Sequence, residues 1–241
     1  MQSSKIPILM YHSIELMPKS TVMRSLHVPP ARFNIQMWML KKLGYKGLSI
    51  RELKPYLSGK KTGKVVGITF DDGYQNNLIN AVPILNKFQF SATCYIVSSQ
   101  IGNSNIWDSS KGITQRPLMT KKEIQTWLDL GMDIGAHSLT HPDLVTLSID
   151  DLKIEIQDCK NELEKTFNIS IEDFCYPYGS FNDTTISLVK DTGYHTATTM
   201  LRGIASLKTD KLKLPRVPIN HHTLPHLFLA KILSKYEERR E

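Results

Sequence analysis

The feature that most constrains this sequence of 241 residues is a regular alternation of short apolar runs with longer amphipathic segments. The short runs are rich in β-branched and aromatic residues, which is typical of buried strands. The expected strands cover 6–11, 46–50, 65–70, 92–97, 133–136, 174–176, 195–199 and 214–218, and the expected helices cover 33–43, 51–57, 76–88, 120–130, 148–167, 183–190 and 224–238. Repeated strand–helix units indicate a parallel sheet of the α/β class. Seven or eight such units favour a deformed (β/α)7-8 barrel over an open, doubly wound sheet.

Composition predicts one folded domain over residues 1–241. Hydrophobic residues make up 41% of the chain, which argues against disorder, and no shift in composition suggests a linker. The formal net charge is +7, carried in part by basic pairs scattered along the chain. These pairs are Lys41–Lys42, Lys60–Lys61, Lys121–Lys122 and Arg239–Arg240. No nucleic-acid-binding motif accompanies them, so no nucleic-acid partner is expected. A basic surface favours peripheral contact with an anionic glycan or a membrane face.

The sequence contains no apolar run long enough to cross a membrane and no recognisable signal peptide. The chain is therefore cytoplasmic as it stands, or it is exported after removal of a signal. Three widely spaced cysteines, Cys94, Cys159 and Cys175, imply no disulfide framework. Cys94 and Cys175 fall inside apolar runs, where we expect them to pack as small hydrophobic residues.

The strand over 65–70 ends in two adjacent acids and a glycine, Asp71-Asp72-Gly73. Buried neighbouring carboxylates are costly unless a cation lies beside them. His137 and His141 follow another expected strand, and one aspartate with two histidines gives three metal ligands and an open position. Zinc is the default ion for this set, and cobalt or nickel also fit. Successive strand side chains point in opposite directions, so one acid is expected to bind the metal and the other to act as general base. Spacing does not say which acid has which role.

Further polar residues stand at the carboxyl ends of expected strands, the face on which barrel enzymes gather their chemistry. His12 and Tyr178 are placed there, together with the acid pair and His137. The long polar stretch over 98–118 carries Trp107 and Asp108. A loop of this length is often functional, and Trp107 either stacks on a sugar or anchors the loop.

Three motifs together resemble the polysaccharide deacetylase family (carbohydrate esterase family 4, NodB homology). They are Thr69-Phe-Asp-Asp-Gly73, His137-Ser-Leu-Thr-His-Pro142 and Tyr176-Pro-Tyr-Gly179, and the resemblance extends over about residues 5 to 220. It implies a NodB-like deformed barrel and the removal of acetyl groups from N-acetylated sugars. It also implies that Asp71 is the general base and that Asp72, His137 and His141 hold the metal. The backbone N–H of Tyr178 would help to hold the oxyanion.

The chain departs from the family pattern at its third motif, which begins with Tyr176 where the family usually has an arginine that orients the catalytic aspartate. Our hypothesis is that Arg216, from the next strand, takes that place; the alternative is a surface arginine at a strand edge.

The general acid is the second departure, because the family usually takes it from a late Leu-x-His motif. This chain has Leu224-Pro225-His226 near its end and Leu9-Met-Tyr-His-Ser-Ile14 near its start. The opening resembles the circularly permuted poly-β-1,6-N-acetylglucosamine deacetylase subgroup, in which the histidine of the first strand is the acid. We therefore predict His12 as the acid in preference to the late histidines, which are His221, His222 and His226.

The resulting prediction is a metal-dependent hydrolase that removes N-acetyl groups from a glycan and releases acetate. Two alternatives belong to other classes. A barrel glycoside hydrolase would need two carboxylates on either side of the substrate, whereas Asp71 and Asp72 are adjacent. A glycan-binding module with little activity would explain the unusual Tyr176, but it would not need an intact base and three metal ligands. The sequence does not identify the glycan.

Overall fold

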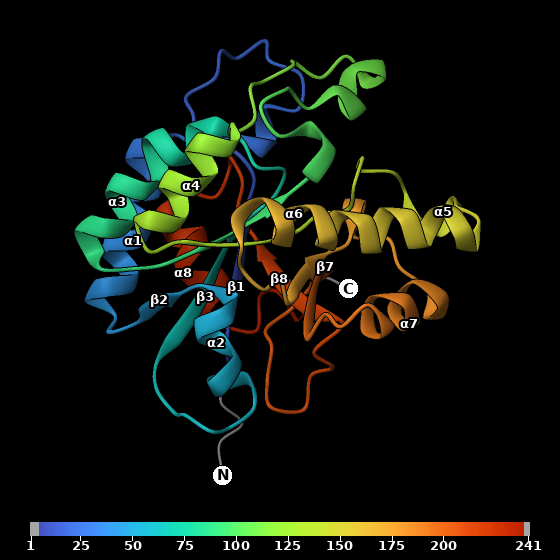
Figure 1. Ribbon diagram of the computed structural model, residues 1–241. Coiled ribbons are helices and arrows are strands. Elements are labelled where there is room, and N and C mark those ends of the chain that lie inside the picture. The colour runs from blue at the N-terminus through green and yellow to red at the C-terminus, as the bar shows by residue number, and fades with distance from the viewer. Residues whose placement is uncertain (1–4, 239–241) are drawn as a thin grey trace.

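The computed structural model describes residues 5–238, which form a closed parallel barrel surrounded by helices (Figure 1). The basic pair Arg239–Arg240 lies outside the described residues. The strands are β1 (Ile8–Tyr11), β2 (Lys46–Leu48), β3 (Val65–Phe70), β4 (Thr93–Ile96), β5 (Asp133–Ala136), β6 (Asp173–Cys175), β7 (Thr196–Arg202) and β8 (Leu214–Pro218). They follow the order β1-β8-β7-β6-β5-β4-β3-β2, and an added β1–β3 pairing closes the ring. The predicted deformed barrel is confirmed.

The distortion of the barrel is located at β3, which pairs with three strands. Its residues 67–70 pair with β1, from Ile8 opposite Gly67 to Tyr11 opposite Phe70. On its other edge β2 pairs with residues 65–67 and β4 pairs with residues 69–70. Seven strands therefore complete the ring, and β2 is an additional strand beside it. Only the carboxyl end of β3 lies between two ring neighbours, and this is the end that carries the acid pair.

The helices are α1 (Pro30–Lys42), α2 (Ile50–Leu57), α3 (Val82–Phe88), α4 (Lys121–Asp129), α5 (Ile149–Lys153), α6 (Cys159–Phe167), α7 (Asp183–Asp191) and α8 (Pro225–Leu233). The start of α4 has a clear local cause, because Thr120 and Glu123 form a capping box there. Two expected helices contain π-helical turns, at Asn77–Ala81 and Ile154–Asp158. Pro83 is tolerated because it falls in the first turn of α3, directly after a π turn. The last helix ends at Leu233 and not at 238 as predicted.

Aromatic packing outside the barrel supports β3 just below the acid pair. The ring of Phe70 lies 5.9 Å from Trp127 in an edge-to-face arrangement and 5.8 Å from Phe33. Trp127 is fully buried, and its indole N–H donates a hydrogen bond to the carbonyl oxygen of Asp133 at 2.8 Å. Fully burying one such ring contributes about 1.5–3 kcal/mol, so α1 and α4 both hold β3 in place.

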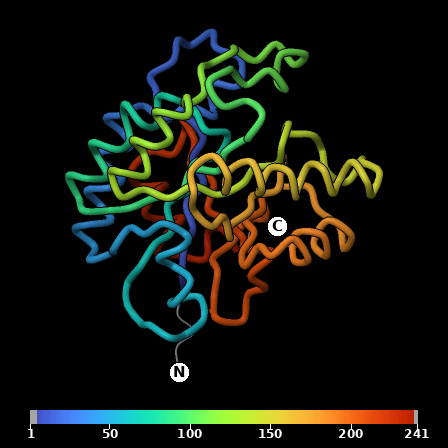
Figure 2. Tube along the Cα trace, viewed as in Figure 1, coloured from blue at the N-terminus to red at the C-terminus, as the bar shows by residue number. Residues whose placement is uncertain are grey.

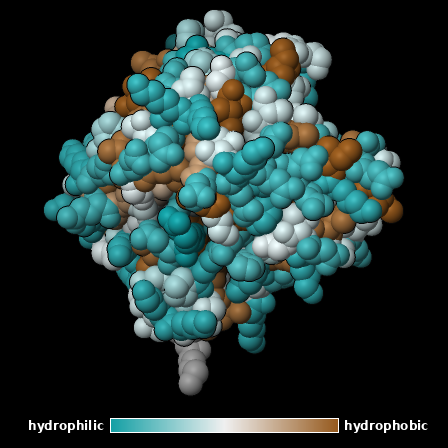
Figure 3. All heavy atoms as spheres, in the orientation of Figure 1, coloured by the Kyte–Doolittle hydropathy of each residue, from teal (hydrophilic) through white to brown (hydrophobic). Residues whose placement is uncertain are grey.

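The carboxyl ends of the strands open toward two long connections, residues 12–29 after β1 and 97–120 after β4. Both project at the top of the ribbon and of the tube (Figures 1 and 2). An ion pair between Glu15 and Arg116 joins them. The face shown in Figure 3 is mostly hydrophilic, with hydrophobic residues in small separate groups. Within residues 5–238, no helix has the length and apolar character needed to span a bilayer.

His27, in the connection after β1, predicts a loss of stability in mild acid. Its ring is buried, with Nδ1 2.7 Å from the Ser13 hydroxyl. Burial lowers the pKa of His27 from 6.5 to about 4, with Glu15 opposing the shift. Between pH 6.5 and about 4, His27 is protonated in the unfolded chain but neutral in the folded protein. The free energy of unfolding therefore decreases as pH falls through this range. His27→Asn is expected to flatten this fall by about 1–2 kcal/mol.

The measurement is the free energy of unfolding in urea at pH 7 and at pH 4.5. His226→Asn is the matched control, because the His226 side chain is exposed and the variant should keep the wild-type dependence. Parallel curves for wild type and His27→Asn would contradict the prediction.

Candidate active site

A cleft of about 320 Å³ opens at the carboxyl ends of the strands. It is lined by residues from β7, β8 and the connections after β1, β3, β4, β5 and β6. All of the site residues predicted from the sequence line it: His12, Asp71, Asp72, His137, His141, Tyr178 and Arg216. Residues that are up to 204 positions apart in the sequence (12 to 216) therefore share one surface.

Asp72, His137 and His141 form a compact set of candidate metal ligands. One ligand atom from each lies within 4.8 Å of the others, and Nε2 of the two rings is 3.6 and 3.5 Å from Asp72 Oδ1. Nδ1 of His137 lies 2.8 Å from the carbonyl oxygen of Cys175. A carbonyl only accepts, so Nδ1 carries a proton, and Nε2 is the ring nitrogen that faces Asp72 and would bind a metal. Burial and the neighbouring His137 lower the pKa of His141 to about 3, so this ring is neutral, as a metal ligand must be. The donor set fits a divalent metal.

Unusual backbone conformations bring these ligands together. Asp72 has φ 73°, and Ser138 and His141 have φ 62° and 66°. Such left-handed conformations are uncommon for residues other than glycine and cost about 1–3 kcal/mol each. The turn at Asp72 explains how two adjacent acids both face the cleft, although side chains on a regular strand would diverge. Gly73, with φ 80°, continues the same turn.

Asp71 is held by Arg216 from β8. The guanidinium donates to both carboxylate oxygens, at 2.7 and 2.8 Å, and its Nε donates to the carbonyl oxygen of Thr199 at 2.8 Å. Arg216 is 1% exposed and Asp71 is 2% exposed. Burial raises the pKa of Asp71, but the facing guanidinium outweighs it and the net shift is downward. Asp71 is therefore an ionised carboxylate whose orientation is fixed.

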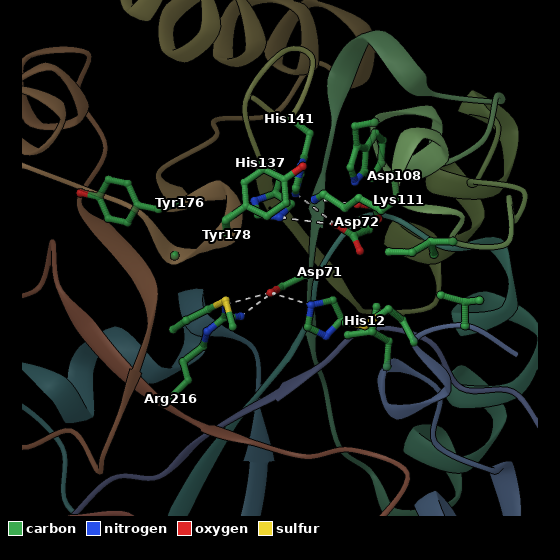
Figure 4. A pocket seen from close by; sticks show the side chains of 17 residues that line it. His12, Asp71, Asp72, Asp108, Lys111, His137, His141, Tyr176, Tyr178 and Arg216 are labelled. Carbon is green, nitrogen blue, oxygen red and sulfur yellow. Dashed lines mark hydrogen bonds and ion pairs between the residues drawn. The ribbon is translucent and has the colours of Figure 1, made fainter. Parts of the chain in front are cut away.

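Tyr176 takes no part in this contact. Figure 4 shows its ring pointing away from Asp71. The ring is buried against Phe174 and Phe181, and its hydroxyl donates to the carbonyl oxygen of Leu212 at 3.1 Å. An aromatic side chain at this position completes the packing outside the barrel, while the arginine reaches Asp71 from β8, with β7 lying between β6 and β8.

His12 lies on the opposite side of Asp71 from Arg216 (Figure 4). Its Nε2 is 3.9 Å from Asp71 Oδ2, and its side chain is 18% exposed to the cleft. The late histidines occupy the connection before α8 and its first turn; His221, for example, donates its backbone N–H to Ser25. Within residues 5–238, none of the three late histidines lines the cleft.

The connection after β4 covers His141, one of the candidate metal ligands. The Trp107 ring stacks on His141 at 4.7 Å, and Tyr178 meets the same imidazole edge-on at 4.6 Å. Lys111 Nζ lies 4.2 Å from the centre of the Tyr178 ring. Asp108 is buried nearby, and burial, reinforced by Asp72, raises its pKa. Trp107 thus anchors its loop on His141, a candidate metal ligand, and loop anchoring is one of its two expected roles. The contact of Lys111 with Tyr178 has no sequence signal that could have predicted it.

The turn that carries Tyr178 is fixed by a close approach to β7. Tyr178 and Gly179 have φ 56° and 71°. A Cβ on Gly179 would lie 2.5 Å from the side chain of Met200, so only glycine fits there. This places the Tyr178 backbone at the cleft, where a donor to a developing oxyanion would be needed.

A closed barrel with an Asp–His–His cluster beside an arginine-held carboxylate defines a hydrolase of the metal-dependent class. The chain belongs to the polysaccharide deacetylase family, whose model matches residues 58–197. It is 30% identical to YxkH of Bacillus subtilis, whose name assigns it to this family, over 90% of this chain and 72% of that protein. It is 26% identical to the poly-β-1,6-N-acetyl-D-glucosamine N-deacetylase of Staphylococcus epidermidis, over 86% of this chain and 73% of that protein.

A solved structure extends the likeness to the whole fold. The Streptococcus pyogenes deacetylase PplD, in complex with acetate, superposes with a TM-score of 0.83 at 31% identity, over 96% of this chain and 99% of that one. The predicted family, the barrel and the enzyme class are confirmed. Membership of a hydrolase family favours neither the glycoside hydrolase nor the glycan-binding module.

Proposed function

We propose that this chain removes N-acetyl groups from a glycan, with Asp71 as general base and His12 as general acid. Asp72, His137 and His141 would hold the divalent metal. The observation that carries the proposal is a buried carboxylate, fixed by Arg216 and placed beside an Asp–His–His cluster that fits a metal. The single domain over residues 1–241 is part of the same proposal.

Asp71 and His12 would have complementary roles. Both oxygens of Asp71 accept from Arg216, which prevents the carboxylate from rotating and keeps it ionised to take a proton from water. His12, on the other side of Asp71, is positioned to give a proton to the departing amine. The Tyr178 N–H would donate to the oxyanion of the tetrahedral intermediate.

A divalent metal, when bound, would supply Lewis acidity and lower the pKa of water toward about 7. Zinc is the default for one carboxylate and two imidazoles, and cobalt and nickel accept the same donors.

The substrate we propose is an exopolysaccharide of the poly-N-acetylglucosamine type. Support comes from the Staphylococcus epidermidis relative, named for poly-β-1,6-N-acetyl-D-glucosamine, and from the acetate in the Streptococcus pyogenes structure. Contact with an anionic glycan or a membrane face stays a separate prediction that rests on the net charge of +7 alone.

Metal removal tests the proposal directly. We expect acetate release from poly-N-acetylglucosamine oligomers to fall to the level of an Asp72→Ala variant after chelation, because the water is then no longer activated. Added zinc should restore the wild-type enzyme but not the variant; cobalt and nickel are assayed in parallel. Asp150→Ala, at an exposed carboxylate, is the control and should match wild type throughout.

The rival classes give different results in the same assay. Full acetate release by a metal-free sample, checked by elemental analysis, would contradict the metal site. Shortened sugar chains without acetate would indicate a glycoside hydrolase. Metal and glycan bound without acetate release would indicate a binding module.

A further inference from the structure

His12, the proposed general acid, lies just after the end of β1. β1 ends at Tyr11, so the pairing with β3 does not fix the orientation of His12. The side chain of Asn77 bonds the backbone there instead. Its Nδ2 donates to the His12 carbonyl oxygen at 2.7 Å, and its Oδ1 accepts from the Ile14 N–H at 3.1 Å. One amide group therefore spans Ser13 and bonds both flanking peptides, as a neighbouring strand would.

Asn77 is itself rigidly placed. It is fully buried and opens the π-helical turn Asn77–Ala81, which follows the acid pair along the chain. Its neighbours in the same turn also bond the His12 segment: Asn76 Nδ2 donates to the Ser13 hydroxyl at 2.8 Å, and Asn80 Nδ2 donates to the Ile14 carbonyl oxygen at 2.8 Å. Positions 76, 77 and 80 lie within about 100° of one another around a helix axis, so their side chains can reach one segment. Asn77 and Asn80 belong to a π turn, and π turns are frequent at functional sites.

We propose that Asn77 is a positioning residue that sets the orientation of His12 for proton donation. The inference rests on the proposed function, in which His12 protonates the departing amine. It also gives the π turn a role, because the chain segment that delivers Asp71 and Asp72 then fixes the acid on the opposite side of the base. Because the amide of Asn77 bonds the peptide of His12 itself, its loss would displace the imidazole. Loss of Asn80 would free only the peptide that follows Ile14.

Turnover of two different substrates distinguishes a positioning role of Asn77 from a purely structural one. An N-acetylated glycan oligomer releases an amine, which must be protonated as it leaves. An aryl ester such as 4-nitrophenyl acetate releases a stable phenolate, which needs no acid. Asn77→Ala is expected to lower kcat for acetate release from the glycan by about 10–100-fold, since small misplacements of catalytic groups cost up to about 10². On the ester, kcat should stay within about 3-fold of wild type. Asn80→Ala, which loses one hydrogen bond in the same turn, should resemble wild type on both substrates.

A double-variant cycle with His12 completes the test. In a His12→Ala background, adding Asn77→Ala should change glycan turnover by less than about 3-fold, because the group it positions is gone. Should Asn77→Ala fail to fold, Asn77→Asp replaces it: it keeps the oxygen that accepts from Ile14 and loses the donor to His12.

Equal losses on glycan and ester would overturn the inference, as would additive effects in the cycle or wild-type glycan turnover. Failure of the proposed function is distinguishable, because wild type itself would then release no acetate from the glycan, and the inference would fall with it.

Discussion

Asp71→Asn is expected to lower kcat for acetate release by about 10²–10⁴-fold while leaving metal content unchanged. The amide keeps the size of the carboxylate and one oxygen that can accept from Arg216, but it cannot take a proton from water. Asp71 also forms a candidate metal group with His137 and Cys175, but both of its oxygens already accept from Arg216, so the expected ligands are Asp72, His137 and His141. The measurements are kcat for acetate release from N-acetylated oligomers and zinc content by elemental analysis.

A matched control separates catalysis from stability. Asp133 is another buried aspartate; it lies at the start of β5, at the opposite end of the barrel, and is paired with Arg51. Asp133→Asn should destabilise the fold without lowering kcat of the folded fraction. An Asp71→Asn enzyme with wild-type kcat, or with a loss that only follows the unfolded fraction, would show that Asp71 is not the base.

Local patterns in the sequence predicted the barrel and the residues that line the cleft. Strands of a parallel sheet are buried on both faces, so they appear as short apolar runs, and any polar residue that follows them is conspicuous. This is why Asp71, Asp72 and His137 can be placed at one end of the barrel from the sequence alone. His12 can be placed in the same way, because it directly follows the first run.

The remaining details depend on geometry that no local pattern encodes. Asp72 faces His137 and His141 because its backbone is left-handed, and the residue type of an aspartate does not predict that conformation. The bidentate contact between Arg216 and Asp71 joins residues 145 positions apart and depends on the pairing of β8 with β1 and of β1 with β3. The sequence suggested the partner but not the two-point geometry.

The π turns escape sequence-based prediction for a related reason. A π turn differs from an α-helical turn by one inserted residue, and the apolar periodicity over 76–88 does not resolve that difference. As a result, the asparagines that bond the His12 segment look like an ordinary polar helix face in the sequence. Cys175 is also incompletely described by its pattern: it is buried as expected, but its Sγ lies 3.3 Å from the Arg216 guanidinium and its carbonyl oxygen bonds His137.

Arg216→Met is expected to lower both the turnover of acetate release and the free energy of unfolding, and to destabilise the fold more than the other variants described above. Removing one partner of a buried ion pair leaves the other charge uncompensated, at a cost of about 3–5 kcal/mol. The methionine fills much of the same space, so the loss should come mainly from the unpaired Asp71 carboxylate. Turnover should fall as well, since the carboxylate is then free to rotate or to become protonated. Arg216→Lys should recover part of the stability but little of the turnover, because an ammonium cannot hold both oxygens in a plane.

A double variant identifies the source of these effects. Arg216→Met combined with Asp71→Asn removes both charges, and replacing a whole buried pair is often close to neutral. The double variant should therefore be more stable in urea than Arg216→Met alone, yet as inactive as Asp71→Asn. If Arg216→Met kept wild-type turnover, the arginine would be only structural and the family's usual orienting role would be absent from this chain. If the double variant were no more stable than the single one, the packing of the Arg216 side chain, and not its charge, would account for the lost stability.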